Sequence, residues 1–349
     1  QPGCWAVQRG VRRAEAWPST TKRGDSPPPI WRRLTLLSSA ATSLALFGRQ
    51  LERADFLARA LRIHLDHSLD RADDPGPGYW TGLMQLAGWS GGDVDRRDEA
   101  VELLVAGAAG PSIRGSIAAA RSAAQAVRPS LPSELYEQVN SLYWRVEEGG
   151  WQHDLHSFLS SVELGVHLIE GLIENTMFHD EAREFVRLGK YMERMQNAVT
   201  VVIRKTAELG AASEDALEWT AALKSCFAFE SYRLRFSAEV TGRQVVGFLL
   251  FDPDLPRSAR YCLGEALDSV HRIDGQRRPS RPEKVLARMA GLFDDSGPAG
   301  VAKNPDEFDR EFKRLGVELT QALRATYFQP SKVTATVPGD PTARVPQQQ

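Results

Sequence analysis

The chain has 349 residues, of which 42% are hydrophobic and 25% are charged, and these proportions are ordinary for a soluble globular protein. Its length is enough for one large helical domain or two smaller ones. The formal net charge of −2 argues against a general nucleic-acid-binding protein, which carries a basic surplus, so no nucleic-acid partner is expected.

Cysteine usage bears on the cellular compartment. The three cysteines, Cys4, Cys226 and Cys262, are far apart, odd in number and outside any CxxC pair. Neither a disulfide framework nor a zinc knuckle is therefore indicated. A reducing cytoplasm fits this pattern best, and we expect a cytoplasmic protein.

The N-terminal stretch is basic, aperiodic and interrupted by prolines, so we expect residues 1–33 to form a disordered basic extension. Arg32 and Arg33 precede the apolar run LTLLSSAATSLALFG, a pattern similar to a short twin-arginine signal sequence. The alternative, which we favour, is that this run begins the first core helix. No run reaches the roughly 18 apolar residues that a membrane span needs, so no membrane association is expected.

The stretch from Leu46 to Asp66 predicts an amphipathic helix, because its apolar residues recur at the spacing of one helical stripe. This stripe consists of Phe47, Leu51, Ala54, Ala58, Leu61 and Leu65. The other side of the helix carries Arg49, Glu52, Arg53 and Phe56. A carboxylate therefore lies beside guanidinium groups on the face away from the stripe.

A second helix with the same design is predicted from Phe185 to Arg204. Its apolar stripe is Leu188, Met192, Met195, Val199 and Val202, and its other face carries Lys190, Glu193, Arg194 and Asn197. Aligning Gly48 with Gly189 places Glu52 on Glu193, 141 residues later, and Arg53 on Arg194. The chain therefore contains an internal repeat of a G-[RK]-x-[LM]-E-R helix.

The remaining apolar segments alternate with Gly- and Pro-containing breaks and show no βαβ order. The run from Val245 to Phe251 resembles a strand, although a buried helix end gives the same pattern. We predict an all-α fold: one multi-helix domain of two loosely repeated halves with about ten to twelve helices. This domain is expected to span residues 34–329, and residues 330–349 to form a disordered tail.

Two Gly-basic-x-apolar-Glu-Arg helices in one helical chain resemble the bacterial alpha-E family, a helical domain with an ER motif. Three further stretches are similar to motifs of that family: Gly115 to Tyr143, Cys226 to Arg233, and Val245 to Leu263. The resemblance covers about Leu36 to Tyr327 and favours a helix for the strand-like run. It implies a bacterial protein that works beside a circularly permuted ATP-grasp ligase and a transglutaminase-like peptidase. The family's own biochemical activity is not established.

The chain departs from the family pattern at several polar positions. It reads Gly110-Pro111-Ser112-Ile113 where relatives carry an N-P-x-S-I motif, and Gln50 stands at a usual tyrosine. The A-R-E-N-A-R motif is altered to ARSAAQ at residues 120–125. Because polar groups are lost along one helix, the resemblance does not by itself assign an activity to this chain.

The two Glu-Arg pairs admit three interpretations. Neighbouring residues on a helix do not face each other, so Glu193 and Arg194 cannot pair together. If the helices pack with approximate two-fold symmetry, Glu52 pairs with Arg194 and Glu193 with Arg53, which is the arrangement we favour. Alternatively, Arg53 and Arg194 hold a carboxylate or phosphate through their planar forks. The third interpretation is plain solvent exposure.

Other chemical signals are weak. Glu163, His167 and Glu170 share one helix face, but a di-iron bundle needs two Glu-x-x-His pairs and two more carboxylates. The sequence has no G-x-S-x-G motif and no P-loop, and Cys226 and Cys262 have the apolar surroundings of core thiols. We therefore assign no catalytic residue, no metal ligand and no cofactor.

From these observations we expect an accessory peptide-binding or scaffolding protein of a bacterial amide-bond-forming system, with the ATP-grasp ligase and the transglutaminase-like peptidase as partners. The candidate binding residues are Arg49, Glu52, Arg53, Lys190, Glu193, Arg194 and Asn197. One alternative is an enzyme that uses Glu52 or Glu193 as a general acid or base on a peptide-like substrate. Another is a metal-binding helical bundle. Whether the chain is an enzyme is left open.

Overall fold

The computed structural model describes residues 38–70, 78–108, 110–210, 213, 215–236, 239–275 and 278–328. Within these ranges the chain forms thirteen α-helices and no β-strand, so the all-α prediction is confirmed with one helix more than the expected ten to twelve. The predicted extension, residues 1–33, and the predicted tail, residues 330–349, lie outside the described residues.

The helices of the first half precede Asp180. They are α1 (Ser38–Asp70), α2 (Tyr79–Leu86), α3 (Arg97–Ala106), α4 (Ile113–Ala126), α5 (Ser133–Glu148) and α6 (Leu155–Thr176). A short 3-10 helix, η1 (Arg128–Ser130), joins α4 to α5.

The helices of the second half begin with the second repeat helix. They are α7 (Glu181–Leu209), α8 (Ala216–Ser225), α9 (Phe229–Arg235), α10 (Gly242–Phe251), α11 (Ala259–Asp274), α12 (Arg281–Lys303) and α13 (Pro305–Leu323), followed by the π-helical turn η2 (Arg324–Phe328). The strand-like run from Val245 to Phe251 lies within α10, and most of its residues are buried. The helical interpretation of that run is therefore correct.

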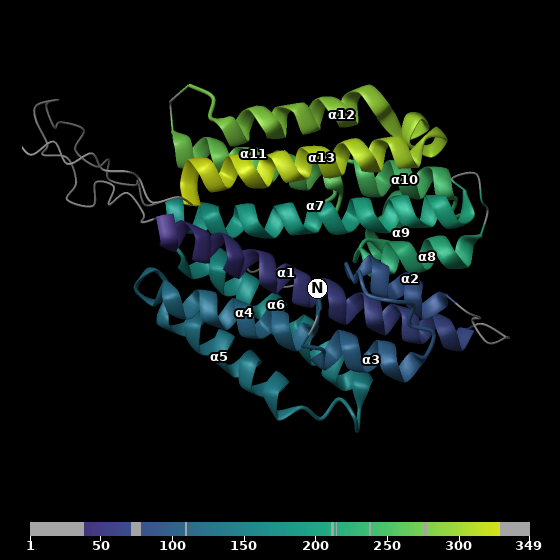
Figure 1. Cartoon of the computed structure of the whole chain (residues 1–349), viewed down its shortest axis with the longest axis horizontal. Helices are drawn as coiled ribbons and strands as arrows, with labels where there is room; N and C mark the ends of the chain where they lie inside the picture. The colour runs from purple at the N-terminus through teal and green to yellow at the C-terminus, as the bar shows by residue number, and fades with distance from the viewer. Residues whose placement is uncertain are drawn as a thin grey trace, which may run out of the picture. The chain divides into compact units, whose positions relative to one another are not determined.

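The two long repeat helices, α1 and α7, pack against each other at the centre of the described residues. Figure 1 shows them side by side, with α4 and α5 on the α1 side and α11, α12 and α13 on the α7 side. Helix α1 also contacts α4 and α6, and α7 also contacts α11. The chain is thus organised around one helix pair, and both halves contribute a layer to it.

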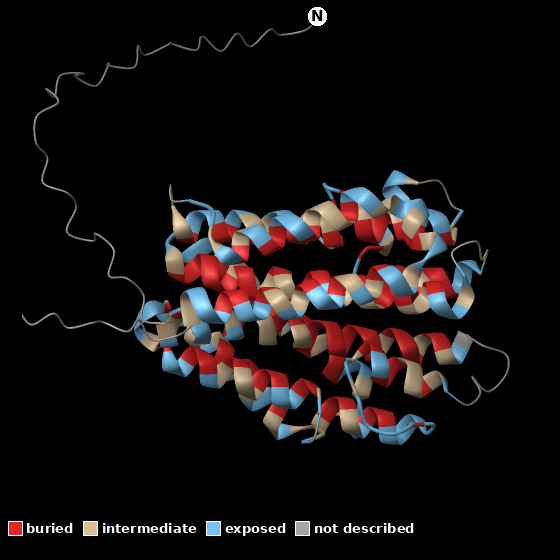
Figure 2. Cartoon of the chain, turned by 45° about the horizontal axis from the view of Figure 1, so that its top comes forward, coloured by how far each residue is buried: buried red, intermediate tan, exposed pale blue. Residues whose placement is uncertain are grey.

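Helix α7 illustrates how local sequence and packing cooperate. The Asp180 side chain accepts hydrogen bonds from the backbone N–H groups of Ala182 and Arg183, and Glu181 and Glu184 add negative charge at the positive end of the helix dipole. The helix ends at Gly210, whose φ of 77° suits glycine. Of its 29 residues, 17 are buried, so α7 is enclosed from several sides. Figure 2 shows the buried residues running along the inward faces of the helices.

The start of α1 decides between the two interpretations of the N-terminal apolar run. From Ser38 onward this run is helical, and Leu44 and Phe47 are fully buried in the core. The core-helix interpretation is therefore confirmed for this part, whereas Arg32 and Arg33 lie outside the described residues. Among the described helices, none combines the length and the apolar character required to cross a bilayer.

Candidate functional site

The two repeat helices approach each other most closely at their glycines. A Cβ atom built on Gly48 would lie 2.0 Å from the carbonyl oxygen of Val186 in α7, and one built on Gly189 would lie 1.9 Å from the carbonyl oxygen of Ala45 in α1. Ala45 and Val186 are themselves 141 residues apart, as Gly48 and Gly189 are. The contact is therefore reciprocal, and only glycine allows the backbones to lie this close.

One turn beyond each glycine, the Glu and Arg residues form reciprocal ion pairs. Glu52 accepts hydrogen bonds from Nε and Nη2 of Arg194 at 2.9 and 2.5 Å. Glu193 accepts from Nε of Arg53 at 2.6 Å and from Nε of Arg49 at 2.7 Å. The pairing predicted from the repeat, Glu52 with Arg194 and Glu193 with Arg53, is confirmed.

The two pairs have different surroundings. The side chains of Glu52 and Arg194 are 2% and 8% exposed, so this pair is sealed in the interior. Glu193 is only 4% exposed, but its partners Arg53 and Arg49 are 28% and 43% exposed. The two ion pairs are therefore related by the approximate symmetry of the backbone but differ in solvent exposure: water reaches the arginines of the Glu193 pair and does not reach the Glu52 pair.

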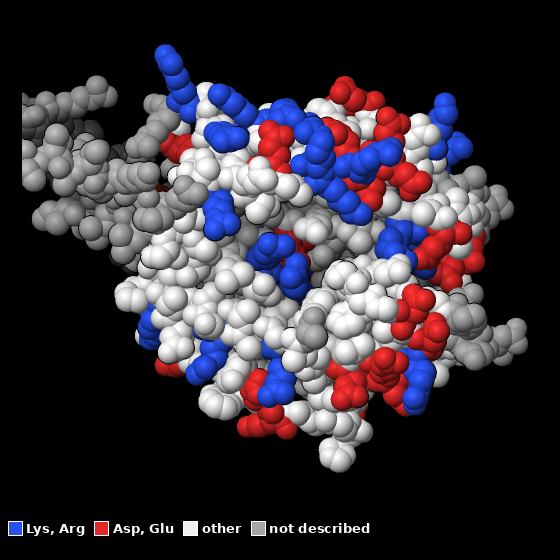
Figure 3. Space-filling view, viewed as in Figure 1, with Lys and Arg blue, Asp and Glu red and all other residues white. Residues whose placement is uncertain are grey.

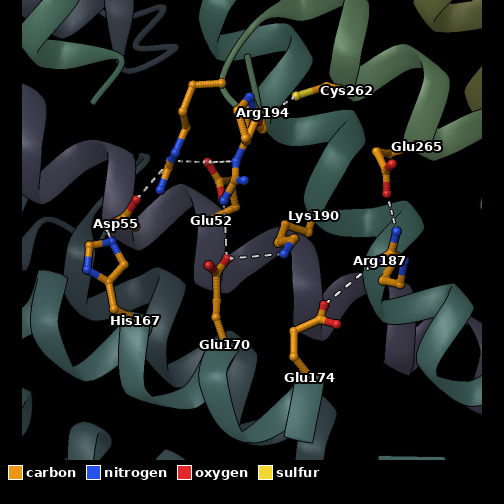
Figure 4. A network of polar contacts seen from close by, with 12 residues as sticks. Glu52, Asp55, His167, Glu170, Glu174, Arg187, Lys190, Arg194, Cys262 and Glu265 are labelled. Atoms are coloured by element: carbon orange, nitrogen blue, oxygen red, sulfur yellow. Dashed lines mark hydrogen bonds and ion pairs between the residues drawn. The ribbon is translucent and has the colours of Figure 1, made fainter. Parts of the chain in front are cut away.

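Around Glu52 the ion pairs extend into a network, part of which is shown in Figure 4. Nη1 of Arg257, in the loop between α10 and α11, donates to Glu52 at 3.2 Å and to Asp55 at 3.3 Å. Asp55 also accepts hydrogen bonds from both terminal nitrogens of Arg59, at 2.9 and 2.7 Å. Charge-assisted forked pairs such as that of Arg59 with Asp55 are the strong ones, and the Nη1 of Arg257 joins α1 to the loop that precedes α11.

These cations control the ionisation of the buried acids. Burial alone would raise the pKa of Glu52, but Arg194 and Arg257 outweigh burial and hold the pKa below its ordinary value. Burial would likewise raise the pKa of Asp55, and Arg59 and Arg257 reverse that effect and lower it. Both acids are therefore anchored as carboxylates. A general acid or base needs a pKa near the working pH and access to substrate, and Glu52 has neither.

Glu163, His167 and Glu170, the residues of the metal hypothesis, also lie in contact with charged partners of the network. Glu163 accepts from Arg62 at 2.8 and 3.2 Å, and Nη2 of Arg194 donates to Glu170 at 3.2 Å. His167 lies 3.4 Å from Asp55. Within the described ranges, no three His, Cys, Asp or Glu side chains converge in a way that could hold a metal ion.

A groove opens beside the Glu193 pair, between α1, α7 and α13. It has a volume of about 840 Å³, and its apolar lining includes Leu46, Leu188, Met192, Met195, Met289, Phe312, Val317, Leu319 and Leu323. Arg49 and Glu193 line it as well. Figure 3 shows a hollow on this face, with basic and acidic atoms gathered beside it.

Two features show that the groove is open rather than a packed interior. Leu46 on the α1 wall and Val317 on the α13 wall are 38% and 60% exposed, although both are large apolar residues of the lining. Gly316, which precedes Val317 on α13, also lines the groove, and a Cβ atom built there would meet nothing within 4 Å. The groove thus has space along its length for side chains from another molecule.

The candidate residues named from sequence fall into two groups. Arg49, Arg53 and Glu193 gather beside the groove, whereas Glu52, Arg194 and Lys190 belong to the network. Asn197 joins neither group, because its side chain makes no hydrogen bond to the described residues and its Nδ2 is buried. Sequence reasoning missed Asp55, Arg59 and Arg257. The i, i+4 spacing of Asp55 and Arg59 is a readable signal, but nothing near Arg257 in the sequence points to Glu52.

Comparison with known proteins gives one family and one relative. The model of the Alpha-E family, described as a predicted alpha-helical domain with a conserved ER motif, matches residues 36–328. The chain is 25% identical over 313 residues to the uncharacterized protein Rv2567 of Mycobacterium tuberculosis (strain ATCC 25618 / H37Rv). The match covers 81% of this chain and 35% of that protein, so the chain spans about a third of its relative's length. No solved structure matches the chain.

Proposed function

The chain belongs to the Alpha-E family, and we propose that it is an accessory binding protein of a bacterial amide-bond-forming system, with the groove between α1, α7 and α13 as its docking surface. The occupant we propose is an amphipathic helical segment of the partner, an ATP-grasp ligase or a transglutaminase-like peptidase. The observation that carries this proposal is the open apolar groove beside an ER-motif ion pair whose charges are already satisfied.

The shape and lining of the groove favour a helix. Its α13 wall runs from Asp309 to Leu323, about 21 Å along the helix axis at 1.5 Å per residue, which is close to the length of four helical turns. A partner helix with apolar residues at i, i+4 and i+7 would place one side chain per turn along that wall. The three methionines of the lining, Met192, Met195 and Met289, have flexible thioether side chains that adapt to the surface they meet.

The charges of the groove favour an acidic flank on the occupant. Arg49 and Glu193 neutralise each other, and Lys313 and Asp309 form an ion pair at 2.6 Å. Arg324, which is exposed and forms no ion pair with the described residues, is left as the uncompensated charge of the lining. The groove is therefore slightly positive, and an acidic residue beside the apolar stripe of a partner helix would complement it.

The same geometry argues against chemistry at the ER motif. Both oxygens of Glu193 accept hydrogen bonds from arginines, and both oxygens of Glu52 do so in a sealed interior. Arg194 donates to Glu52 and Glu170 and is 8% exposed, so it cannot also hold a substrate. In this proposal the ER motif is structural: it fixes α1 against α7 and so shapes the floor of the groove.

The proposal is tested by filling the groove. Gly316→Leu adds a side chain into open space on the groove wall, and leucine is a better helix former than glycine, so the fold should not suffer. Gly264→Leu on α11 is the matched control, because a Cβ atom there also meets nothing within 4 Å and Gly264 does not line the groove. Both variants and the wild-type chain are immobilised, and their affinities for the purified ligase and peptidase of the same organism are measured by interferometry.

We expect wild type and Gly264→Leu to bind one of the two enzymes with equal affinity, and Gly316→Leu to bind at least about tenfold more weakly, since a blocked contact costs more than 1.4 kcal/mol. If Gly316→Leu bound the enzyme with the same affinity as wild type, the groove would not be part of the interface. Failure of wild type to bind either enzyme would overturn the accessory function.

A further inference from the structure

A second cavity borders the buried network. It is a cleft of about 490 Å³ among α6, α7, α9 and the loop between α10 and α11, and it shares no lining residue with the groove. Its polar lining includes Glu170 and Glu174 of α6, Lys190 of α7, and Arg257 of the loop. Two cations and one aromatic ring in this cleft have properties that the ion-pair network does not explain.

Arg257 has unused hydrogen-bonding capacity. Only its Nη1 is engaged, with Glu52 and Asp55, and its side chain is 13% exposed. Its Nε and Nη2 make no hydrogen bond to the described residues, and neither atom is among the fully buried polar atoms. Arg257 is therefore fixed by two acids on one side and presents free N–H donors on the other, the side of the cleft.

The ammonium group of Lys190 also has unused hydrogen-bonding capacity. Its ammonium lies 3.7 Å from Oε1 of Glu170, too far for a hydrogen bond, and it makes no hydrogen bond to the described residues. Its side chain is 14% exposed, and burial lowers its pKa below the ordinary lysine value. Glu170 already accepts from Arg194, so Lys190 is held only by this longer ion pair and by the ring of Tyr191 at 4.8 Å, and its three N–H donors make no hydrogen bond to the described residues.

The aromatic ring belongs to Phe227, which follows Cys226, the C-cap residue of α8. Its φ is 54°, a left-handed backbone conformation that is strained for a bulky residue and is normally taken by glycine at this position. The ring is 55% exposed, yet it is flanked by the guanidinium groups of Arg59 at 4.5 Å and Arg257 at 5.3 Å and by the ring of His167 at 5.4 Å. Strain of this kind, kept at the mouth of a cleft, is typical of residues that contact a ligand.

We propose that this cleft binds a small carboxylate ligand with an aromatic or flat apolar group, held by Arg257 and Lys190 at the carboxylate and by Phe227 at the apolar end. The ligand carboxylate accepts hydrogen bonds from the free N–H donors of Arg257 and Lys190. The apolar end of the ligand packs against the exposed ring of Phe227. Glu170 and Glu174 do not repel the ligand decisively, because Arg194 neutralises the first and Arg183 and Arg187 the second. The site is independent of the proposed groove.

The test is calorimetry with the full chain and two probes. N-acetylphenylalanine carries the carboxylate and the ring, whereas phenylalaninamide carries the ring without a carboxylate. Lys190→Gln removes one cation that has no hydrogen bond to lose, and Phe227→Gly removes the ring while relieving the strained backbone. Phe178→Gly, at a phenylalanine that is 86% exposed and outside the cleft, is the control for loss of a surface ring.

We expect N-acetylphenylalanine to bind wild type and Phe178→Gly, and phenylalaninamide to bind neither. Lys190→Gln should weaken binding at least about tenfold, the range of one charge-assisted contact. Phe227→Gly should abolish binding while its thermal midpoint stays equal to that of wild type or rises. Absence of binding to wild type up to about 10 mM, equal binding of both probes, or unchanged binding in Lys190→Gln would each overturn the proposal.

Discussion

Gly48 and Gly189 are the equivalent glycines of the two repeat helices, and each lies against the backbone of the other helix. The carbonyl oxygens of Val186 and Ala45 occupy the space where their Cβ atoms would be, at 2.0 and 1.9 Å. This crossing sets the distance between α1 and α7, and with it the reach of every Glu-Arg pair between them. It also makes the two glycines positions of the helix pair that tolerate no side chain.

Gly189→Ala should lower the free energy of unfolding by about 3 kcal/mol, because a Cβ atom would collide with backbone that cannot rotate away. Gly291→Ala on α12 is the control, since its Cβ atom meets nothing within 4 Å and alanine should there add about 0.5–1 kcal/mol of helix stability. Urea unfolding followed by circular dichroism measures both. A Gly189→Ala variant as stable as wild type would mean that the crossing is not as close as described.

The two ER carboxylates should differ in their contribution to stability. Glu52→Ala removes the carboxylate that accepts two hydrogen bonds from buried Arg194 and one of the two acids that hold Arg257, and it should cost on the order of 3–5 kcal/mol. Glu193→Ala leaves Arg49 and Arg53, which are 43% and 28% exposed and can be hydrated, and should cost about 2 kcal/mol. Urea unfolding of the two variants gives the comparison, and equal losses would show that both pairs have the same access to water.

Buried His64 should make stability depend on pH. Its Nδ1 donates to the carbonyl of Ala60 at 2.8 Å, and burial lowers its pKa from 6.5 to about 4. Between these values the unfolded chain takes up a proton that the folded chain refuses, so the free energy of unfolding falls by about 3 kcal/mol as the pH decreases through this window.

In His64→Gln this contribution should be absent, so the curve of unfolding free energy against pH should be flatter than that of wild type between pH 6.5 and 4. Nuclear magnetic resonance titration of the imidazole in wild type gives the same information directly. A His64 resonance that titrates near pH 6.5 would refute the prediction.

The chain alone should not hydrolyse ATP. Its sequence has no P-loop motif, and its described residues contain no strand and no acid cluster suited to a metal ion. Phosphate release from Mg-ATP is the measurement, with Glu193→Gln as the companion variant. Turnover that this variant abolishes would favour the enzyme alternative over the accessory one.

Much of the central helix pair could be predicted because its sequence motif is short and occurs twice in the chain. The repeat places Gly48, Glu52 and Arg53 at the same spacing as Gly189, Glu193 and Arg194, and two-fold packing then places each acid opposite the ER arginine of the other helix. The close crossing follows from the same glycines once the helices are known to touch.

The rest depends on contacts that no local pattern records. Arg257 reaches Glu52 across 205 residues of sequence, from a loop whose direction is set by the packing of α10 and α11. The strain at Phe227 depends on how α8 ends, and apolar residues of the groove such as Met192 and Leu188 have the same spacing as core residues. Whether an apolar stripe meets another helix or an open groove is decided by α13, which lies more than a hundred residues further along the chain.

Hydrogen exchange of the full chain, measured with and without the ligase and the peptidase, shows whether a partner docks in the groove between α1, α7 and α13. We expect one enzyme to slow exchange in residues 42–49 and 312–324, and exchange in α5 (Ser133–Glu148), which lies outside the groove, to be unchanged. Gly316→Leu should not show this protection. Protection confined to other helices, or none with either enzyme, would contradict the account.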